Sequence, residues 1–175
     1  LAMLGISEGM YPGAQVLVAR KGKVIYQKNF GHHEYTDKIQ VTDSSVYDLA
    51  SLTKILASLP LIMQLVDKKE LSMNTKLSEM LPEYKNSNKA NITLKEMLSH
   101  YARLKTWIPF YRHTFNEEKT GISSKYYSEI PDKDFNIQVA ENLYMRRDYM
   151  DTIFKTIRES DLNSRLEYKY SDLPY

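Results

Sequence analysis

Ser51 and Lys54 are the residues of this chain whose types and spacing best suit covalent catalysis. They lie three positions apart in the stretch "VYDLASLTKILASLP", residues 46–60. If this stretch is helical, both side chains project from one face, and the amine lies beside the hydroxyl. A serine hydroxyl is a weak nucleophile until a neighbouring group accepts its proton. A lysine can accept it where burial or nearby positive charge lowers the pKa of its amine toward neutral.

The same spacing has a plainer explanation, namely two polar residues on a solvated helix face. An S-x-x-K pattern arises by chance about once in a chain of this length. The neighbouring sequence favours the first explanation, in which Ser51 is a nucleophile. Asp43, Ser44 and Ser45 are helix-capping residue types before the apolar residues resume, which places Ser51 near a helix start. A backbone N–H there can donate to an oxyanion. A second polar motif, "YSD" at 170–172, lies near the end of the sequence.

The elements that must position these residues begin with a hairpin. Residues 13–31 read "GAQVLVARKGKVIYQKNFG", in which two β-rich runs flank a turn where Gly22 can supply a positive φ. Apolar residues then recur at helical spacing from Leu49 to Val66. They cover more than one stripe, so we expect a helix buried on several sides. Pro60 should kink or break it.

The rest of the chain is predicted to be mainly helical. "ITLKEMLSHYARL" reads as a helix that opens with a capping box at Thr93 and Glu96, and His100 is interpreted as a packed or capping residue. Residues 105–134 read as an irregular loop or insertion, and residues 135–160 as one or two helices. The predicted organisation is therefore a hairpin and connection over 1–45, followed by a mainly helical part over 46–175.

Composition excludes several functions. The chain has 24 basic and 22 acidic residues and no cysteine. The net charge of +2 gives no electrostatic reason to bind nucleic acid, and the missing thiols exclude disulfides and a cysteine nucleophile. The apolar run 59–66 is too short to span a bilayer, so no transmembrane segment is predicted. His32, His33 and Glu34 are adjacent and point to opposite faces of a strand, so no metal site is predicted either.

The order of four motifs resembles a known superfamily. The motifs are "PGAQVLVARKGKVIYQKNFG", "SLTK", "ITLKEMLSH" and "YSDLPY". They resemble the serine β-lactamase and penicillin-binding-protein-like superfamily, within the branch of class C β-lactamases, D-Ala-D-Ala carboxypeptidases and esterases. The resemblance is carried by residues 11 to about 101 and by the last eight residues.

The resemblance implies both a fold and a set of roles. The fold would be α+β and β-lactamase/transpeptidase-like, with the N-terminal hairpin opening an antiparallel sheet and a helical subdomain beside it. Ser51 would be acylated, Lys54 would take or relay its proton, and Tyr170 would act as a second base. Asp172 stands where the family has a substrate-binding Asn. No cofactor is implied.

Three departures from the family pattern affect the function. A carboxylate at Asp172 accepts hydrogen bonds but cannot donate to a carbonyl, and it favours a protonated Lys54. "SHYARLKTW" stands where the family has a sequence like "THTSGL". "KTG" at 119–121 precedes "YSD" and has loop-like flanks, whereas the family's K-T-G or H-T-G follows it on a strand. We therefore expect that motif and the remaining strands beyond Tyr175, so that the chain is truncated to about half of a family domain.

Two hypotheses follow. The first is a fragment of a β-lactamase-related serine hydrolase, acting through an acyl-enzyme on cell-wall-type peptides, β-lactams or esters in the bacterial cell envelope or periplasm. Such a fragment would be inactive alone, and its open sheet edge would favour self-association. The alternative is a degenerate ligand-binding or accessory domain. It would be fused to a β-N-acetylglucosaminidase-like glycoside hydrolase, as in some Bacteroidetes proteins with a similar domain.

Overall fold

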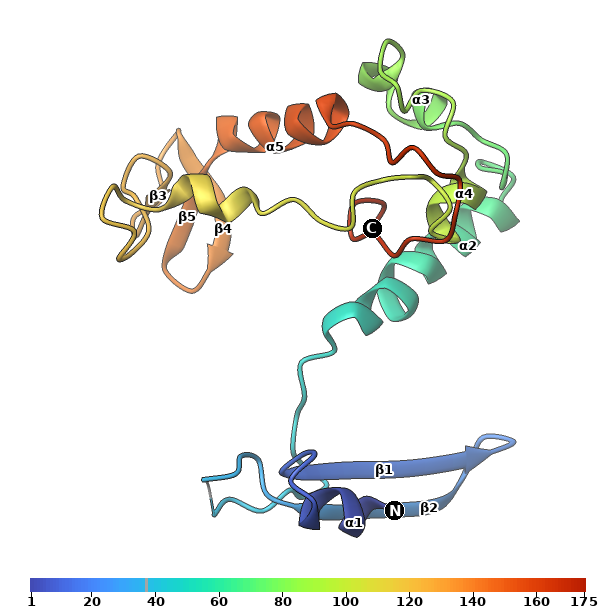
Figure 1. Cartoon of the computed structure of the whole chain (residues 1–175), viewed down its shortest axis with the longest axis vertical. Helices are drawn as coiled ribbons and strands as arrows, with labels where there is room; N and C mark the ends of the chain where they lie inside the picture. The colour runs from blue at the N-terminus through green and yellow to red at the C-terminus, as the bar shows by residue number, and fades with distance from the viewer. Residues whose placement is uncertain (37) are drawn as a thin grey trace. The chain divides into compact units, whose positions relative to one another are not determined.

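The computed structural model describes residues 1–36 and 38–175. The chain divides into two compact units, Leu1–Ser51 and Leu52–Tyr175 (Figure 1).

The first unit is built on the predicted hairpin. A short helix, α1 (Ala2–Ser7), precedes the antiparallel strands β1 (Gly13–Arg20) and β2 (Lys23–Gly31). The two turn residues both have positive φ, 50° at Lys21 and 74° at Gly22. Two-residue hairpin turns of this kind match the right-handed twist of the strands, and glycine adopts that conformation without strain. The hairpin prediction is confirmed.

Three helical segments follow one another from Ala50 to Asp67. They are the 3-10 turn η1 (Ala50–Leu52), the π-helical segment η2 (Lys54–Ser58) and the α-helix α2 (Leu59–Asp67). Pro60 has no N–H and cannot bond to the carbonyl four residues earlier. The backbone widens just before it, where the N–H of Leu59 donates to the carbonyl of Lys54, five residues back. The predicted disturbance at Pro60 therefore appears as a π segment.

The predicted burial of this helical run on several sides is wrong. None of the three segments contains a buried residue among those described, and the Leu52 side chain is 52% exposed. Only one side of α2 packs against the core of the second unit, through Ile62 and Val66. By length and composition alone, Ala50–Asp67 is apolar enough to cross a membrane. A single helix of this kind is weak evidence, because helices of soluble cores pass the same test.

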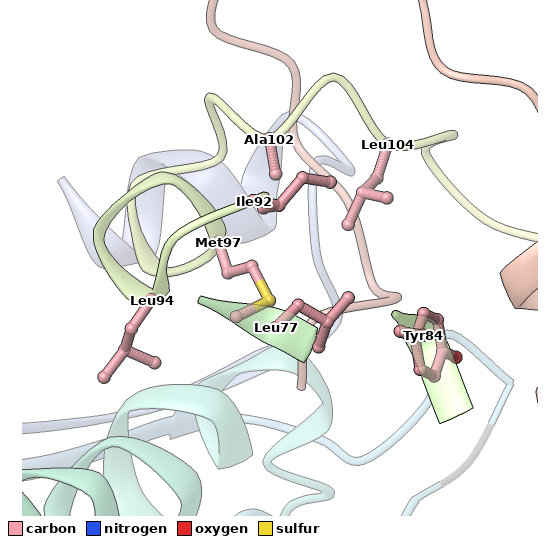
Figure 2. Packing of buried hydrophobic residues seen from close by; sticks show 7 residues of the cluster. All are labelled: Leu77, Tyr84, Ile92, Leu94, Met97, Ala102 and Leu104. Atoms are coloured by element: carbon pink, nitrogen blue, oxygen red, sulfur yellow. The ribbon is translucent and has the colours of Figure 1, made fainter. Parts of the chain in front are cut away.

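The core of the second unit is formed around three short helical elements, α3 (Leu77–Met80), η3 (Pro82–Tyr84) and α4 (Leu94–Leu98). Figure 2 shows its seven buried side chains, which are Leu77, Tyr84, Ile92, Leu94, Met97, Ala102 and Leu104. The capping box predicted for α4 is confirmed. Thr93 Oγ1 accepts from the N–H of Glu96 at 3.3 Å, and Glu96 Oε2 accepts from the N–H of Thr93 at 2.8 Å.

A small sheet replaces part of the predicted loop and helices. After η4 (Phe110–Thr114), the strands β3 (Tyr127–Ser128), β4 (Phe135–Ala140) and β5 (Leu143–Arg146) form an antiparallel sheet in the order β3-β5-β4. The helix α5 (Arg147–Glu159) then follows.

The prediction of helix over 135–146 is therefore wrong, and the part from 46 to 175 is less helical than expected. Phe135, Ile137 and Val139 alternate with polar residues, which is the period of a strand. The two residues between β4 and β5 form a tight turn in which Asn142 has a φ of 50°. The prediction holds for residues 147–159, where α5 forms.

A fully buried lysine connects the core to the C-terminal end of α5. Lys89 Nζ donates to Asn88 Oδ1 at 2.8 Å and to the carbonyl of Arg158 at 3.1 Å. It also donates to the carbonyl of Ser160. The last carbonyls of a helix lack partners within the helix, so this ammonium caps α5.

Candidate active site

The structure brings Lys54 together with the distant "YSD" motif. Lys54 Nζ lies 2.7 Å from Asp172 Oδ1 and forms an ion pair with it. The same Nζ lies 5.2 Å from the centroid of the Tyr170 ring and 5.8 Å from that of the Tyr175 ring. The Lys54 side chain is 15% exposed, whereas that of Asp172 is 53% exposed. The proximity predicted for Lys54, Tyr170 and Asp172 is therefore found.

These contacts stabilise the charged form of the lysine. The hydrogen bond to Asp172, and after it the one to Tyr170, raises the pKa of Lys54 above its ordinary value of 10.5. Burial acts in the opposite direction but is outweighed. At neutral pH Lys54 is therefore an ammonium, which donates hydrogen bonds and does not accept a proton. Because its folded-state pKa is raised, the pair's contribution to stability is present at neutral pH and is lost as pH rises through that pKa.

Two backbone hydrogen bonds hold the motif in place. The N–H of Lys169 donates to the carbonyl of His100 at 2.9 Å, and the N–H of Asp172 donates to the carbonyl of Thr106 at 2.8 Å. The two segments that meet here, 98–106 and 168–175, are the regions of the "SHYARLKTW" and "YSDLPY" motifs. The first motif therefore serves as the support for the second.

Ser171, between the two proposed functional residues, strengthens this attachment. Its side chain is only 2% exposed, and its Oγ donates to the carbonyl of Lys105 at 2.7 Å. The same Oγ accepts from the N–H of Leu173 at 3.2 Å. These two bonds of Ser171 Oγ fix the backbone on either side of it, next to Tyr170 and Asp172. Ser171 thus stabilises the backbone of the "YSD" motif.

Ser51 lies in the first turn of the helical run, in η1, three residues before Lys54. Its position near the helix start agrees with the sequence prediction, but the capping residue differs. Asp48 Oδ1 accepts from the N–H of Ala50 at 2.7 Å at the start of η1. The predicted caps instead form a local turn, in which Ser45 Oγ accepts from the N–H of Thr42.

The "KTG" sequence at 119–121 lies in a turn, as its flanks predicted. Asn116 Oδ1 accepts from the N–H groups of Thr120 and Gly121 at 2.9 and 3.3 Å, and Lys119 has a φ of 57°. A residue with positive φ inside such a turn is not part of a sheet ladder. This "KTG" therefore lacks the strand setting of the family's last motif.

The histidines near the hairpin have local partners. His33 Nε2 lies 3.0 Å from Ser45 Oγ. Among residues 1–36 and 38–175, no three His, Asp or Glu side chains are grouped to hold a metal ion.

Two residues beside Lys54 and Tyr170 were not predicted as site residues from the sequence. His100 packs its ring 4.6 Å from that of Tyr170, and Tyr175 places its ring near the Lys54 ammonium. Tyr175 Oη also donates to the carbonyl of Leu98 at 3.0 Å. The signal that could have found them is their position inside the two motifs that meet here.

Comparison with known proteins identifies the family. The Beta-lactamase family model matches residues 5–168, so the chain belongs to this family. Protein flp of Staphylococcus aureus is 30% identical over 97 residues, which cover 54% of this chain and 19% of flp. Penicillin-binding protein 4* of Bacillus subtilis (strain 168) is 27% identical over 108 residues, which cover 62% of this chain and 23% of that protein.

A solved structure supports the α+β, β-lactamase-like fold. EstCE1, a hydrolase with promiscuous acyltransferase activity, aligns with a TM-score of 0.58 and 20% identity. The alignment covers 97% of this chain and 41% of EstCE1. The chain thus spans less than half of this structure and about a fifth of the two curated relatives.

Proposed function

We propose that this protein is a serine hydrolase of the Beta-lactamase family that works through an acyl-enzyme on Ser51. The observation that carries the proposal is the meeting of Lys54 with Tyr170 and Asp172 beside the S-x-x-K motif. A lysine and a tyrosine in contact can pass a proton between them, and a serine three residues before the lysine lies on the same side of a helix.

The proposed reaction has two balanced steps. In the first, Ser51 Oγ attacks the substrate carbonyl while its proton passes to a basic form of the Lys54–Tyr170 pair. The bond from the carbonyl carbon to the leaving group breaks, and the leaving group takes up that proton. In the second, a water molecule attacks the acyl-serine, which restores the Ser51 hydroxyl and releases a carboxylic acid. The pair holds and returns the proton in both steps.

The proposed substrates are cell-wall-type peptides, β-lactams or small esters. The relatives named above support this range, because one is a penicillin-binding protein and another is a hydrolase with acyltransferase activity. An envelope location would suit the first two classes and remains a prediction. A fused glycoside hydrolase and self-association also remain predictions, and no relative reported above is a glycoside hydrolase.

Covalent labelling tests the proposal. Because the chain alone is expected to be inactive, the full-length protein that contains it is incubated with a fluorescent penicillin and, separately, with a fluorophosphonate, beside Ser51→Ala and the control Ser124→Ala. Ser124 is exposed and lies in a turn of the second unit. We expect labelling of the wild type and of Ser124→Ala, and none of Ser51→Ala. Labelling that persists in a folded Ser51→Ala protein would contradict the proposal.

A non-catalytic ligand-binding domain is the second candidate, and the Lys54–Asp172 ion pair favours it. The pair keeps the proposed base protonated and places a carboxylate where the family has an amide. Under this candidate, the protein binds penicillin reversibly and forms no adduct. Equilibrium dialysis together with intact-mass measurement separates the two.

A further inference from the structure

His100 lies in the segment 98–106, where it meets the segment 168–175 that carries Tyr170 and Asp172. It follows α4 with a φ of 60°, and its carbonyl accepts the N–H of Lys169. Its Nδ1 accepts from the N–H of Ser171 at 3.3 Å. The side chain and the backbone of His100 therefore hold the residues on both sides of Tyr170.

The His100 ring also contacts Tyr170 directly. The two ring centroids are 4.6 Å apart with an interplanar angle of 36°. Tyr175 packs on the same imidazole at 5.6 Å and Tyr168 at 5.9 Å. Aromatic contacts of this kind add to the stabilisation from buried area, so the imidazole fixes the direction of the Tyr170 ring.

The bond from Ser171 specifies the protonation state of the imidazole. A backbone N–H can only donate, so Nδ1 must carry a lone pair, and a neutral ring then has its hydrogen on Nε2. Protonation of Nδ1 would remove the acceptor and place two donors against each other. The attachment of the "YSD" motif thus requires a neutral His100.

The charges around His100 favour this neutral form. The groups that face it are the Lys54 ammonium, the Asp172 carboxylate and the phenols of Tyr168, Tyr170 and Tyr175. Burial lowers the pKa of His100 below its ordinary value, and the charge of Lys54 lowers it further. The charge of Asp172 opposes this shift but is the smallest of the three causes.

We propose that His100 is a positioning residue: as a neutral imidazole it holds Ser171 and Tyr170 so that Tyr170 and Asp172 meet Lys54. Protonation of His100 loosens residues 168–175 and separates Tyr170 from the lysine. The catalytic consequence rests on the proposed function, because it supposes that Tyr170 and Lys54 handle the Ser51 proton. The structural consequence stands without it.

Two variants distinguish the role of the His100 hydrogen-bond acceptor from that of its aromatic ring. His100→Asn tolerates the positive φ, offers an amide oxygen to the Ser171 N–H and does not titrate near neutral pH. His100→Phe keeps an aromatic ring but has no acceptor. His113→Asn is the control, since His113 is exposed in η4 of the same unit. Circular dichroism and thermal melting confirm that each variant is folded.

The first measurement does not depend on catalysis. Amide hydrogen exchange of Ser171 and Lys169 is followed by NMR from pH 4 to 8 and corrected for the intrinsic exchange rate. We expect protection in the wild type and in His113→Asn to fall at least about tenfold as His100 protonates. His100→Asn should show no such step, and His100→Phe should lack the protection of Ser171 throughout.

The second measurement is the rate of Ser51 labelling by fluorescent penicillin over the same pH range. We expect the rate to fall more steeply with acid in the wild type than in His100→Asn, because only the wild type adds the protonation of His100 to that of the Lys54–Tyr170 pair. Protection of Ser171 that is independent of pH in the wild type, or unchanged in His100→Phe, would overturn the inference. If the exchange protection of the Ser171 amide falls as His100 protonates but Ser51 is never labelled, the proposed function fails while the positioning role of His100 holds.

Discussion

Lys54 Nζ and Asp172 Oδ1 lie 2.7 Å apart, although the two residues come from opposite ends of the second unit's sequence. At the position of Asp172 the related family has an asparagine, which can both accept from a lysine and donate to a substrate carbonyl. The aspartate can only accept, and its hydrogen bond is the largest of the causes that raise the pKa of Lys54. This substitution therefore bears most directly on how well the proposed site can work.

Replacing the aspartate should activate the site. Asp172→Asn removes the main cause of the raised Lys54 pKa, and each pKa unit recovered increases the neutral fraction of the amine about tenfold. We expect faster acylation of Ser51 by fluorescent penicillin at pH 7 and a pH–rate profile displaced toward lower pH. Because Asp172 is half exposed, the loss of the ion pair should cost less than about 1 kcal/mol of stability.

Asp151→Asn is the matched control for this experiment, since it removes an exposed carboxylate from α5. Its acylation rate should equal that of the wild type. An Asp172→Asn protein that acylates no faster than the wild type would show that the charge of Asp172 does not limit the site.

The phenol of Tyr170 should matter more than its ring. Tyr170→Phe keeps the aromatic face near the Lys54 ammonium but removes the hydroxyl that bonds to it. Proton transfer by a positioned group contributes about 100- to 10,000-fold to a rate. We expect at least a 100-fold slower acylation with little change in melting temperature. Tyr168→Phe, from the same segment, should acylate normally, and equal losses in both variants would refute a specific role for Tyr170.

The buried Lys89 should be a major contributor to stability. Lys89→Met leaves the carbonyls of Arg158 and Ser160 without their ammonium donor at the end of α5. An unsatisfied buried polar group costs about 1–3 kcal/mol, so urea unfolding should show a loss of at least that order. Lys85→Met, at an exposed position of the same loop, should lie within about 0.5 kcal/mol of the wild type. Similar losses for both lysines would contradict the capping role.

The "KTG" turn should be dispensable for chemistry. Lys119 lies in a turn closed by Asn116, and it lacks the strand setting that the family's last motif requires. Lys119→Ala should therefore label with fluorescent penicillin at the wild-type rate. A loss of more than about tenfold would mean that this lysine contributes to the site after all.

Features that depend on a local sequence pattern, or on the order of motifs along the chain, were predictable. The hairpin followed from two β-rich runs around Gly22, and the capping box followed from Thr93 and Glu96. The meeting of Lys54 with Tyr170 and Asp172 followed from the order of short motifs, which no local pattern would have revealed. Most of the predictions about the site therefore came from the family resemblance.

Features that depend on tertiary partners were not predictable. Residues 135–146 were assigned to a helix although Phe135, Ile137 and Val139 alternate with polar residues, because strand and helix are hard to separate over segments as short as β4 and β5. Burial of the run Ala50–Asp67 was inferred from its apolar faces, but burial depends on which other segments reach those faces. His100 carried no distinctive pattern, because its importance comes from contacts with residues far along the chain.

The most direct test of the account is peptide mapping after reaction with a fluorescent penicillin. The labelled protein is digested, and the modified residue is identified by tandem mass spectrometry in the wild type, Ser51→Ala and Lys54→Met. The proposed acyl-enzyme mechanism predicts one adduct on Ser51 in the wild type, none in Ser51→Ala and a strongly reduced amount in Lys54→Met. An adduct on any other residue, or an unmodified Ser51 in a protein that binds the penicillin reversibly, would contradict it.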